Sequence, residues 1–303
     1  MKYIDLHCDA LTQEGAAQVT RKRLAAGGCL LQCFAAFVEG GGFSAFLRLA
    51  DAFDEMCERE GYRRVTGADG IAEGCTGAML TVEGDALQGD LSRLDTLYAR
   101  GVRIVGLVWN TPTSLGFPNF PDYEGVCAGR VSFSARETAR GLTSFGFEAV
   151  GRMAERGMLP DVSHGSDKLF SDVASFKRPF IATHSNAAGV CGWARNLTDG
   201  QIKEVADCGG VVGLNFCADF AGAENSAAQQ REALLRHARA IINAGGEDVL
   251  AVGSDFDGIP PNAYIPDPSY MPRFLSDLAG AVGTRAAEKA ACGNALRVFR
   301  ENL

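Results

Sequence analysis

The sequence lacks the segments that place a protein in a membrane or export it. Its longest uncharged, apolar-rich stretch runs from Leu24 to Val38 and is shorter than the ~20 residues that a helix needs to span a bilayer. The N-terminal segment has no continuous apolar region of the secretory kind, because Asp5 and His7 interrupt it. We therefore expect no membrane partner and a cytoplasmic location.

Positive charge is also scarce. The chain of 303 residues carries 29 Lys and Arg against 37 Asp and Glu, a net charge of −8. An acidic balance without a Lys/Arg cluster argues against a nucleic-acid partner. Apolar residues make up 47% and charged residues 22% of the chain, which is typical of a globular protein with a substantial core.

The cysteines lack the spacing and density of structural or metal-binding cysteines. Ten of the 303 residues are cysteines, a fraction well under the ~8–10% of a disulfide-stabilised scaffold. No two of them form a CxxC pair. Most lie in apolar runs such as LLQCFAAF around Cys33. We interpret them as reduced residues of the core, in keeping with a cytosolic protein.

Short apolar runs alternate with amphipathic or Ala-rich stretches along the whole chain. Many of the runs are apolar almost throughout, as in GGVVGLNF, which is the pattern of parallel strands buried on both faces. The predicted strands are Tyr3–His7, Leu30–Val38, Ala78–Glu83, Val102–Trp109, Leu159–His164, Phe180–His184, Val211–Phe216 and Val249–Asp255. The predicted helices are 43–60, 91–100, 135–156, 166–176, 198–208, 226–244, 269–283 and 286–301.

Eight strands alternating with helices predict an α/β fold, a (β/α)8 TIM-type barrel formed by residues 1–303 as a single domain. The competing architecture is a doubly wound open sheet, but no GxGxxG or P-loop follows the first strand. The longest irregular segment, 110–134, contains Pro112, Pro118 and Pro121. After strand four it would lie over the barrel mouth, as a lid or a substrate-contacting loop.

Histidine carries the strongest functional signal. The chain has four, and three of them, His7, His164 and His184, stand at the carboxyl ends of predicted strands. Active sites of (β/α)8 enzymes lie at that end of the barrel. The fourth, His237, lies in the predicted helix LLRHARAII and is interpreted as a surface or packing residue without a functional role.

Acidic residues share this location. Asp9 follows His7 with strand periodicity, which puts both on one face. Glu83 ends strand three, and Asp255 ends strand eight with Asp257 two residues further on. Imidazole and carboxylate ligands suit Zn²⁺, Mn²⁺ or Co²⁺ and exclude a thiolate site. The pattern predicts two divalent metal ions at the carboxyl ends of the strands.

Each of these residues also has an ordinary structural interpretation. A single histidine at a strand end is more often a hydrogen-bonded core residue than a ligand. Glu83, Asp255 or Asp257 could cap the helix that follows. These interpretations would have to hold at five strand ends simultaneously, and for that reason we favour the metal site.

At these residues the chain resembles the membrane (renal-type) dipeptidase family, the M19 metallopeptidases with an amidohydrolase-like barrel. The resemblance covers essentially the whole chain. It is carried, in the family's order, by DLHCDAL, TVEGDAL, DVSHGSD, ATHSNA followed by ARNLTD, VGSDFDG and GNALRVFREN. The resemblance implies His7 and Asp9 on one metal, His164 and His184 on the other, and Glu83 between them.

The resemblance further implies that Asp255 is the catalytic acid and base and that Arg195 binds the substrate carboxylate. In one place the chain departs from the family. Renal-type members carry a histidine after strand four that contacts the substrate carbonyl, whereas this strand ends LVWNTPTSLG and Trp109 takes that place. The indole N–H of Trp109 could still donate one hydrogen bond, and Asn110 is the other candidate for substrate contact.

The predicted activity is hydrolysis of small dipeptides, with a D-residue at the second position as one variant. Two metals would lower the pKa of a shared water towards ~7. Asp255 would move the proton, and Arg195 would bind the terminal carboxylate. The alternatives are another amidohydrolase acting on N-acyl amino acids, cyclic amides or lactams, and a non-catalytic metal- or ligand-binding barrel. The oligomeric state that we consider for the protein is a homodimer.

Overall fold

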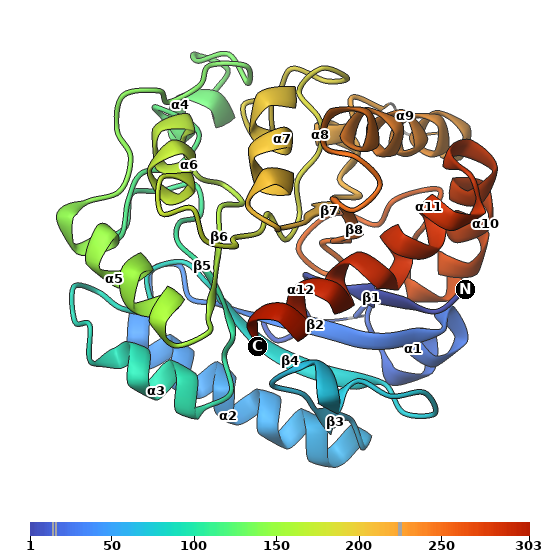
Figure 1. Ribbon diagram of the computed structural model, residues 1–303, viewed down its shortest axis with the longest axis horizontal. Helices are drawn as coiled ribbons and strands as arrows, with labels where there is room; N and C mark the ends of the chain where they lie inside the picture. Colours follow the sequence, from blue (N-terminus) through green and yellow to red (C-terminus); the bar gives the residue numbers. More distant parts are fainter. Residues whose placement is uncertain (14, 16, 224–225) are drawn as a thin grey trace.

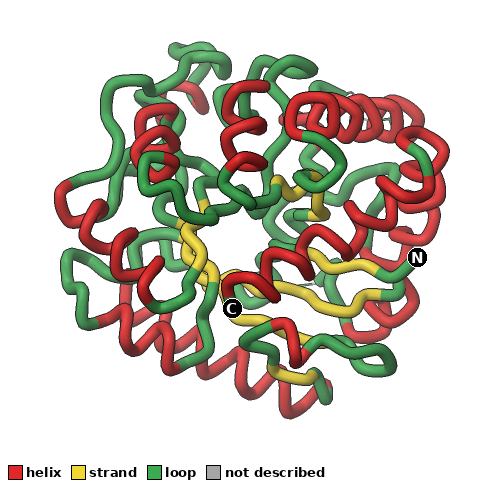
Figure 2. Tube along the Cα trace, viewed as in Figure 1, coloured by secondary structure: helices red, strands yellow, loops and turns green. Residues whose placement is uncertain are grey.

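The computed structural model describes residues 1–13, 15, 17–223 and 226–303. Its parallel strands lie inside a surrounding ring of helices (Figures 1 and 2). The strands follow the order β6-β5-β4-β2-β1-β8-β7, and β3 pairs with β4. Their bounds are β1 Tyr3–Asp5, β2 Cys29–Phe37, β3 Arg63–Arg64, β4 Gly77–Glu83, β5 Ile104–Gly106, β6 Leu159–Asp161, β7 Val212–Leu214 and β8 Leu250–Val252.

The predicted strand Phe180–His184 makes only isolated bridges. Ile181 pairs with Asp161 of β6 and Ala182 with Val212 of β7, both in parallel. These bridges link the two ends of the strand order, so the sheet curls into the (β/α)8-type barrel that the sequence predicts. The short β3 lies outside the predicted eight.

Apart from β4, which ends at Glu83 as predicted, the remaining strands end earlier than predicted, because side chains near these ends accept hydrogen bonds from the backbone. Asp5 accepts a hydrogen bond from the amide of His7 at 3.3 Å. Asp161 accepts from the amide of Ser163 at 2.9 Å. An Asp side chain that binds the amide two residues on replaces the next ladder bond with a turn. The predicted metal ligands other than Glu83, which is still part of β4, therefore lie in segments immediately after the strands.

Helices cover the outside of the barrel (Figure 1). Helix bounds are α1 Arg21–Gly27, α2 Gly42–Glu60, α3 Arg93–Ala99, α4 Tyr123–Cys127, α5 Ser144–Glu155, α6 Asp167–Ala174, α7 Asp199–Asp207, α8 Ala218–Ala221, α9 Ala227–Gly245, α10 Met271–Val282, α11 Thr284–Glu288 and α12 Asn294–Asn302. Within the described ranges, none of these helices has both the length and the apolarity that crossing a membrane requires.

One helix prediction and one loop prediction need correction. The predicted helix 135–156 begins only at α5, because Thr143 caps it by accepting from the amide of Gly146. The segment before it is held as a loop by Glu137, whose carboxylate accepts from the amides of Ala139 and Arg140. The predicted irregular segment 110–134 contains the short helix α4.

The apolar core has two parts. One part lies between the strands and the outer helices. The other fills the barrel, where Ile4, Leu31 and Met79 pack with Val298 and Phe299 of α12. In Figure 1, α12 crosses the barrel strands. Phe299 is completely buried, so α12 closes the amino-terminal end of the barrel and leaves the carboxyl end for the site.

Candidate metal centre

The predicted site residues converge at the carboxyl end of the barrel. His7 follows β1, Glu83 is the last residue of β4, His164 follows β6, His184 follows the bridged segment, and Asp255 follows β8. Parallel strands end at the same rim of a barrel, so residues far apart in sequence meet there. All five side chains are buried.

The backbone is strained at this rim. His164, Asp255 and Asp257 have φ values of 65°, 66° and 67°, in the left-handed region that residues with a Cβ rarely adopt. Each such residue costs roughly 1–3 kcal/mol, and strain of this kind gathers at functional sites. Three of the five non-glycine residues with positive φ in the described chain lie here, which supports a functional role for this rim.

Glu83 lies between two groups of imidazoles. Its Oε1 is 3.4 Å from Nε2 of His164 and 3.6 Å from Nε2 of His184. Its Oε2 is 3.7 Å from Nε2 of His7. The two carboxylate oxygens therefore face different imidazole groups, while Nε2 of His164 and Nε2 of His184 are 3.1 Å apart.

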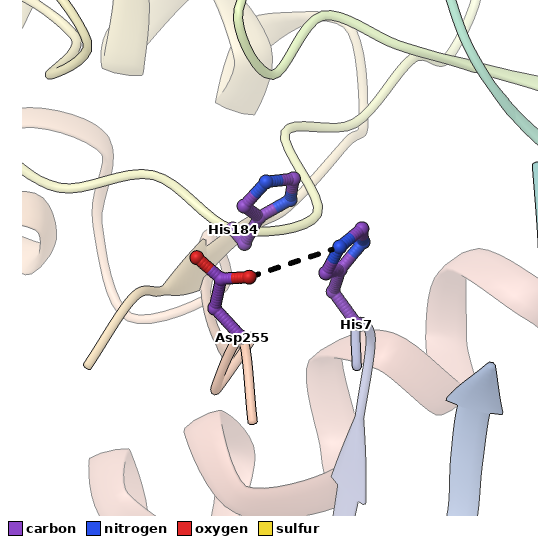
Figure 3. A group of neighbouring side chains, drawn as sticks. All are labelled: His7, His184 and Asp255. Carbon is purple, nitrogen blue, oxygen red and sulfur yellow. Dashed lines mark ion pairs between the residues drawn. The ribbon is translucent and has the colours of Figure 1, made fainter. Parts of the chain in front are cut away.

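Around His7 the partners are carboxylates. Its Nε2 lies 3.4 Å from Oδ2 of Asp9 and 3.9 Å from Oδ1 of Asp255, the contact drawn in Figure 3. Its ring stacks on that of His184 with centroids 3.8 Å apart. Gly258 leaves room for both carboxylates, because a Cβ there would stand 2.1 Å from Asp9 Oδ2 and 2.6 Å from Asp255 Oδ1.

The donor atoms fit divalent metal ions. Three groups of ligand atoms lie within 4.8 Å of one another, and the groups are His7-Asp9-Glu83, Glu83-His164-His184 and His7-His184-Asp255. Nε2 of His7 and Oε1 of Glu83 are buried without a hydrogen-bond partner among the residues that the structure describes, an arrangement that costs free energy unless something else binds them. Nitrogen and oxygen ligands that surround Zn²⁺ at ~2.0–2.2 Å have separations of this order.

A second layer of side chains orients two of the imidazoles. Oδ1 of Asn110 is 2.9 Å from Nδ1 of His164. Oγ1 of Thr183 is 2.8 Å from Nδ1 of His184 and donates to the carboxylate of Asp161. Both contacts leave Nε2 free to face Glu83, the usual arrangement behind a metal-binding histidine. Sequence reasoning missed Thr183 and Asp161, because a polar residue inside an apolar strand has no distinguishing pattern.

The charges of the cluster are strongly coupled. Burial opposes a charged His7, but Asp9, Glu83 and Asp255 outweigh it and raise its pKa to about 10. Burial raises the pKa of Glu83 to about 8 and that of Asp255 to about 7. Burial lowers the pKa of His164 and His184. These two imidazoles are therefore neutral, as metal ligation requires.

A cavity of about 380 Å³ opens onto this cluster, a size suited to a small ligand. Its wall includes Asp9, Glu83, Trp109, Asn110, Tyr123, His164, His184, Phe220, Asp255 and Asp257. Trp109 stands edge-on to Phe37 and Tyr123, with its ring 6.2 Å from that of His164. A larger groove of about 700 Å³ between α6 and α7 contains none of the clustered residues.

Arg195 lies beside the cluster but not on the cavity wall. It is buried, and its Nη1 donates to Ser185 Oγ at 2.9 Å while its Nη2 donates to the carbonyl of His184 at 2.7 Å. Its Nε has no partner within the described part of the chain. Its guanidinium carbon lies 5.8 Å from the ring of Phe220, which lines the cavity.

Asp257 and His237 have structural contacts. The carboxylate of Asp257 accepts from the amides of Gln18 and Val19 at 2.6 and 3.0 Å, so it anchors a neighbouring loop at the cavity. His237 is fully buried, a packing and not a surface residue. Its ring bonds the amide of Ala187 and the carbonyl of Ala221 and thereby connects the loop after His184 to the end of α8.

A buried cluster of imidazoles and carboxylates at the mouth of a parallel α/β barrel defines a metal-dependent hydrolase. The family model for membrane dipeptidase, peptidase family M19, matches residues 2–302. The chain belongs to the M19 metallopeptidase family of membrane dipeptidases.

Individual relatives agree with this assignment. A protein encoded in the pqqA 5' region of Klebsiella pneumoniae is 36% identical over 217 residues, which are 68% of this chain and 74% of that protein. A metallopeptidase from Rhodobacter sphaeroides, solved with a phosphinate mimic of the dipeptide L-Ala-D-Ala, is 26% identical with a TM-score of 0.87 and coverage of 100% and 99%. An amidohydrolase from Pseudomonas aeruginosa shares the fold, at 21% identity, a TM-score of 0.83 and coverage of 99% and 95%.

Proposed function

We propose that the protein is a binuclear-metal dipeptidase that hydrolyses the amide bond of small dipeptides. One observation carries the proposal, which is the position of Glu83. One of its carboxylate oxygens faces His164 and His184, and the other faces His7. A carboxylate that lies between two groups of metal ligands is typical of a two-metal hydrolytic site.

In this proposal His7 and Asp9 hold one ion, His164 and His184 hold the other, and Glu83 contacts both. Zinc is the first choice, with manganese or cobalt as alternatives, because the donors are nitrogen and oxygen. Two such ions would supply a hydroxide nucleophile at neutral pH and a Lewis acid for the substrate carbonyl.

Asp255 is proposed as the proton carrier. Its Oδ2 accepts from the amide of Asn215 at 2.9 Å, which fixes the carboxylate at the cavity wall with Oδ1 towards His7. Burial raises its pKa to about 7, close to the value at which a carboxylate both takes and returns a proton efficiently. It would accept the proton of the attacking water and give it to the leaving amine.

The small cavity, the family and the phosphinate mimic bound by the Rhodobacter sphaeroides neighbour support a dipeptide as the substrate. A D-residue at the second position remains part of the proposal. The ten free cysteines support a reducing compartment such as the cytoplasm.

One observation favours a second candidate, an amidohydrolase for N-acyl amino acids, cyclic amides or lactams. The carboxylate-binding residue of the dipeptidase hypothesis, Arg195, is buried beside the cavity and does not line it. Without a carboxylate clamp the same cluster would hydrolyse amides in general.

The deciding experiment combines metal analysis with a panel of substrates. The purified protein is expected to contain close to two metal ions per chain and to cleave dipeptides, including those with a D-residue at the second position. A chelator should abolish hydrolysis, and Zn²⁺, Mn²⁺ or Co²⁺ should restore it. Full activity without metal would overturn the metal site, and cleavage of N-acyl amino acids or lactams alone would select the second candidate.

A further inference from the structure

Tyr123 is a polar group of the cavity wall that the mechanism above does not use. It is the first residue of α4, inside the segment 110–134, and it lines the cavity. Its ring stands edge-on to Trp109 at 5.6 Å and packs against Phe120 at 5.9 Å. Asp122 caps the helix by accepting from the amide of Gly125 at 2.8 Å. These contacts fix the direction of the phenol.

The phenol oxygen is connected to the metal centre through Asn110. The carbonyl oxygen of the Asn110 side chain faces Nδ1 of His164 at 2.9 Å, so its amide nitrogen is the end that bonds Tyr123. The Tyr123 oxygen is therefore an acceptor towards Asn110, and the side chain of Cys127 is its second hydrogen-bond partner. Because the sulfur of a cysteine is a weak acceptor, the phenol proton can be donated instead to a stronger acceptor such as a carbonyl oxygen. Burial raises the pKa of Tyr123, with the neighbouring Cys127 adding to the effect, so the hydroxyl stays protonated at neutral pH.

Two other donors at the cavity wall already have partners. The hydroxyl of Thr12 donates to the carbonyl of Asp9 at 3.0 Å, and the amide of Asn110 is bonded as described. Arg195 does not line the cavity. The indole N–H of Trp109 is the neighbouring alternative to Tyr123, and its ring contacts that of Tyr123 directly.

We propose that the hydroxyl of Tyr123 donates a hydrogen bond to the carbonyl oxygen of the scissile amide and stabilises the negative charge that develops there. When the oxygen of water bonds to the carbonyl carbon, the π electrons of the C=O bond move onto its oxygen. Tyr123 keeps its proton throughout, and the electrons return when the C–N bond breaks and the amine leaves with the proton from Asp255. The inference rests on the proposed amide hydrolysis.

Kinetics of three single variants test the inference. Tyr123→Phe removes one oxygen and keeps both ring contacts. It is expected to lower kcat roughly 10- to 100-fold with little change in KM. This loss lies between the effect of removing an ordinary hydrogen bond and the effect of removing an oxyanion-hole donor. The exposed Tyr270→Phe is expected to keep kcat within about 3-fold of wild type, the size of a minor packing change. Trp109→Phe removes the neighbouring indole N–H and tests that alternative donor in the same assay.

Binding of a tetrahedral phosphinate dipeptide mimic, measured by calorimetry, gives a readout independent of turnover. Tyr123→Phe should weaken the mimic by about the factor lost in kcat, with metal content and melting temperature unchanged, because a transition-state contact is lost from both. Unchanged kcat and phosphinate affinity in Tyr123→Phe, or the same losses in Trp109→Phe instead, would overturn the inference. A wild-type protein that cleaves no amide would overturn the proposed function itself.

Discussion

Nδ1 of His164 lies 2.9 Å from Oδ1 of Asn110, and Nε2 of the same ring faces Glu83 and His184. Because the amide oxygen can only accept, it fixes the imidazole tautomer that leaves Nε2 free for a metal. Asn110 is in this way a support for His164 as well as a residue of the cavity wall.

The first prediction follows from this contact. Asn110→Ala should weaken metal binding about 10- to 100-fold, the usual effect of losing the partner behind a metal-binding histidine. Metal titration of the chelator-treated protein measures this directly. A raised KM with normal metal affinity would instead show that Asn110 contacts substrate and does not orient His164.

The second prediction concerns the shared carboxylate. Glu83→Gln should lose most of the metal from one or both positions and nearly all hydrolysis, because a neutral amide is a poor ligand for two cations. Elemental analysis and activity on the same preparation test it. Normal metal content in Glu83→Gln would show that Glu83 has a structural role and does not bind metal.

The third prediction separates proton transfer from metal binding. Asp255→Asn should keep the fold and most of the metal while kcat falls by roughly 10²–10⁴, the usual contribution of a positioned acid–base group. The matched control is Asp257→Asn, two residues away, whose carboxylate bonds the amides of Gln18 and Val19. That control should lower stability more than kcat. Retained kcat in Asp255→Asn would remove its proposed role.

The fourth prediction decides between a dipeptidase and a general amidase. If Arg195 binds the substrate carboxylate, wild type should prefer a dipeptide over its C-terminal amide by about 10- to 150-fold in kcat/KM, the equivalent of a charge-assisted contact of ~1.5–3 kcal/mol. Arg195→Lys should recover only part of this preference, because an ammonium cannot make the paired contact. Equal rates for acid and amide would favour the amidohydrolase alternative.

The fifth prediction concerns pH and stability without metal. The folded-state pKa values of Glu83, about 8, and of His7, about 10, lie above their ordinary values. A folded state that binds more protons than the unfolded chain loses stability as pH rises. His164 and His184 have pKa values below the ordinary 6.5. Their contribution to the stability of the fold is lost as pH falls below that value and is nearly constant well above it, so they do not reverse this trend at higher pH.

The melting temperature of chelator-treated protein is therefore expected to fall from pH 6.5 to pH 8, and that of metal-loaded protein should change less. The stabilisation given by added Zn²⁺ should accordingly grow with pH over this interval, since the metal replaces the protons. Differential scanning calorimetry at the two pH values measures both trends. A metal effect independent of pH would contradict the charge coupling around Glu83.

Several features of the fold could be predicted from local pattern. Apolar runs alternating with amphipathic stretches indicate the parallel barrel, because strands buried on both faces must be apolar throughout. The apolar pattern predicts strand ends too far along the chain, at His164 and Asp255. The strands end earlier because side chains such as Asp161 accept hydrogen bonds from backbone amides. The helix before Thr143 was wrong for a similar reason, since Glu137 binds the backbone amides that a helix would use.

The amino-acid sequence by itself determined which residue types stand at the carboxyl ends of the strands, because strand period and parallel order bring His7, Glu83 and His184 to one rim. Only the tertiary structure decided what surrounds them. The support of His184 by Thr183 and Asp161, the position of Arg195 beside Phe220 and the place of Tyr123 on the cavity wall depend on contacts between distant segments. Such contacts follow from packing in three dimensions, and no local pattern encodes them.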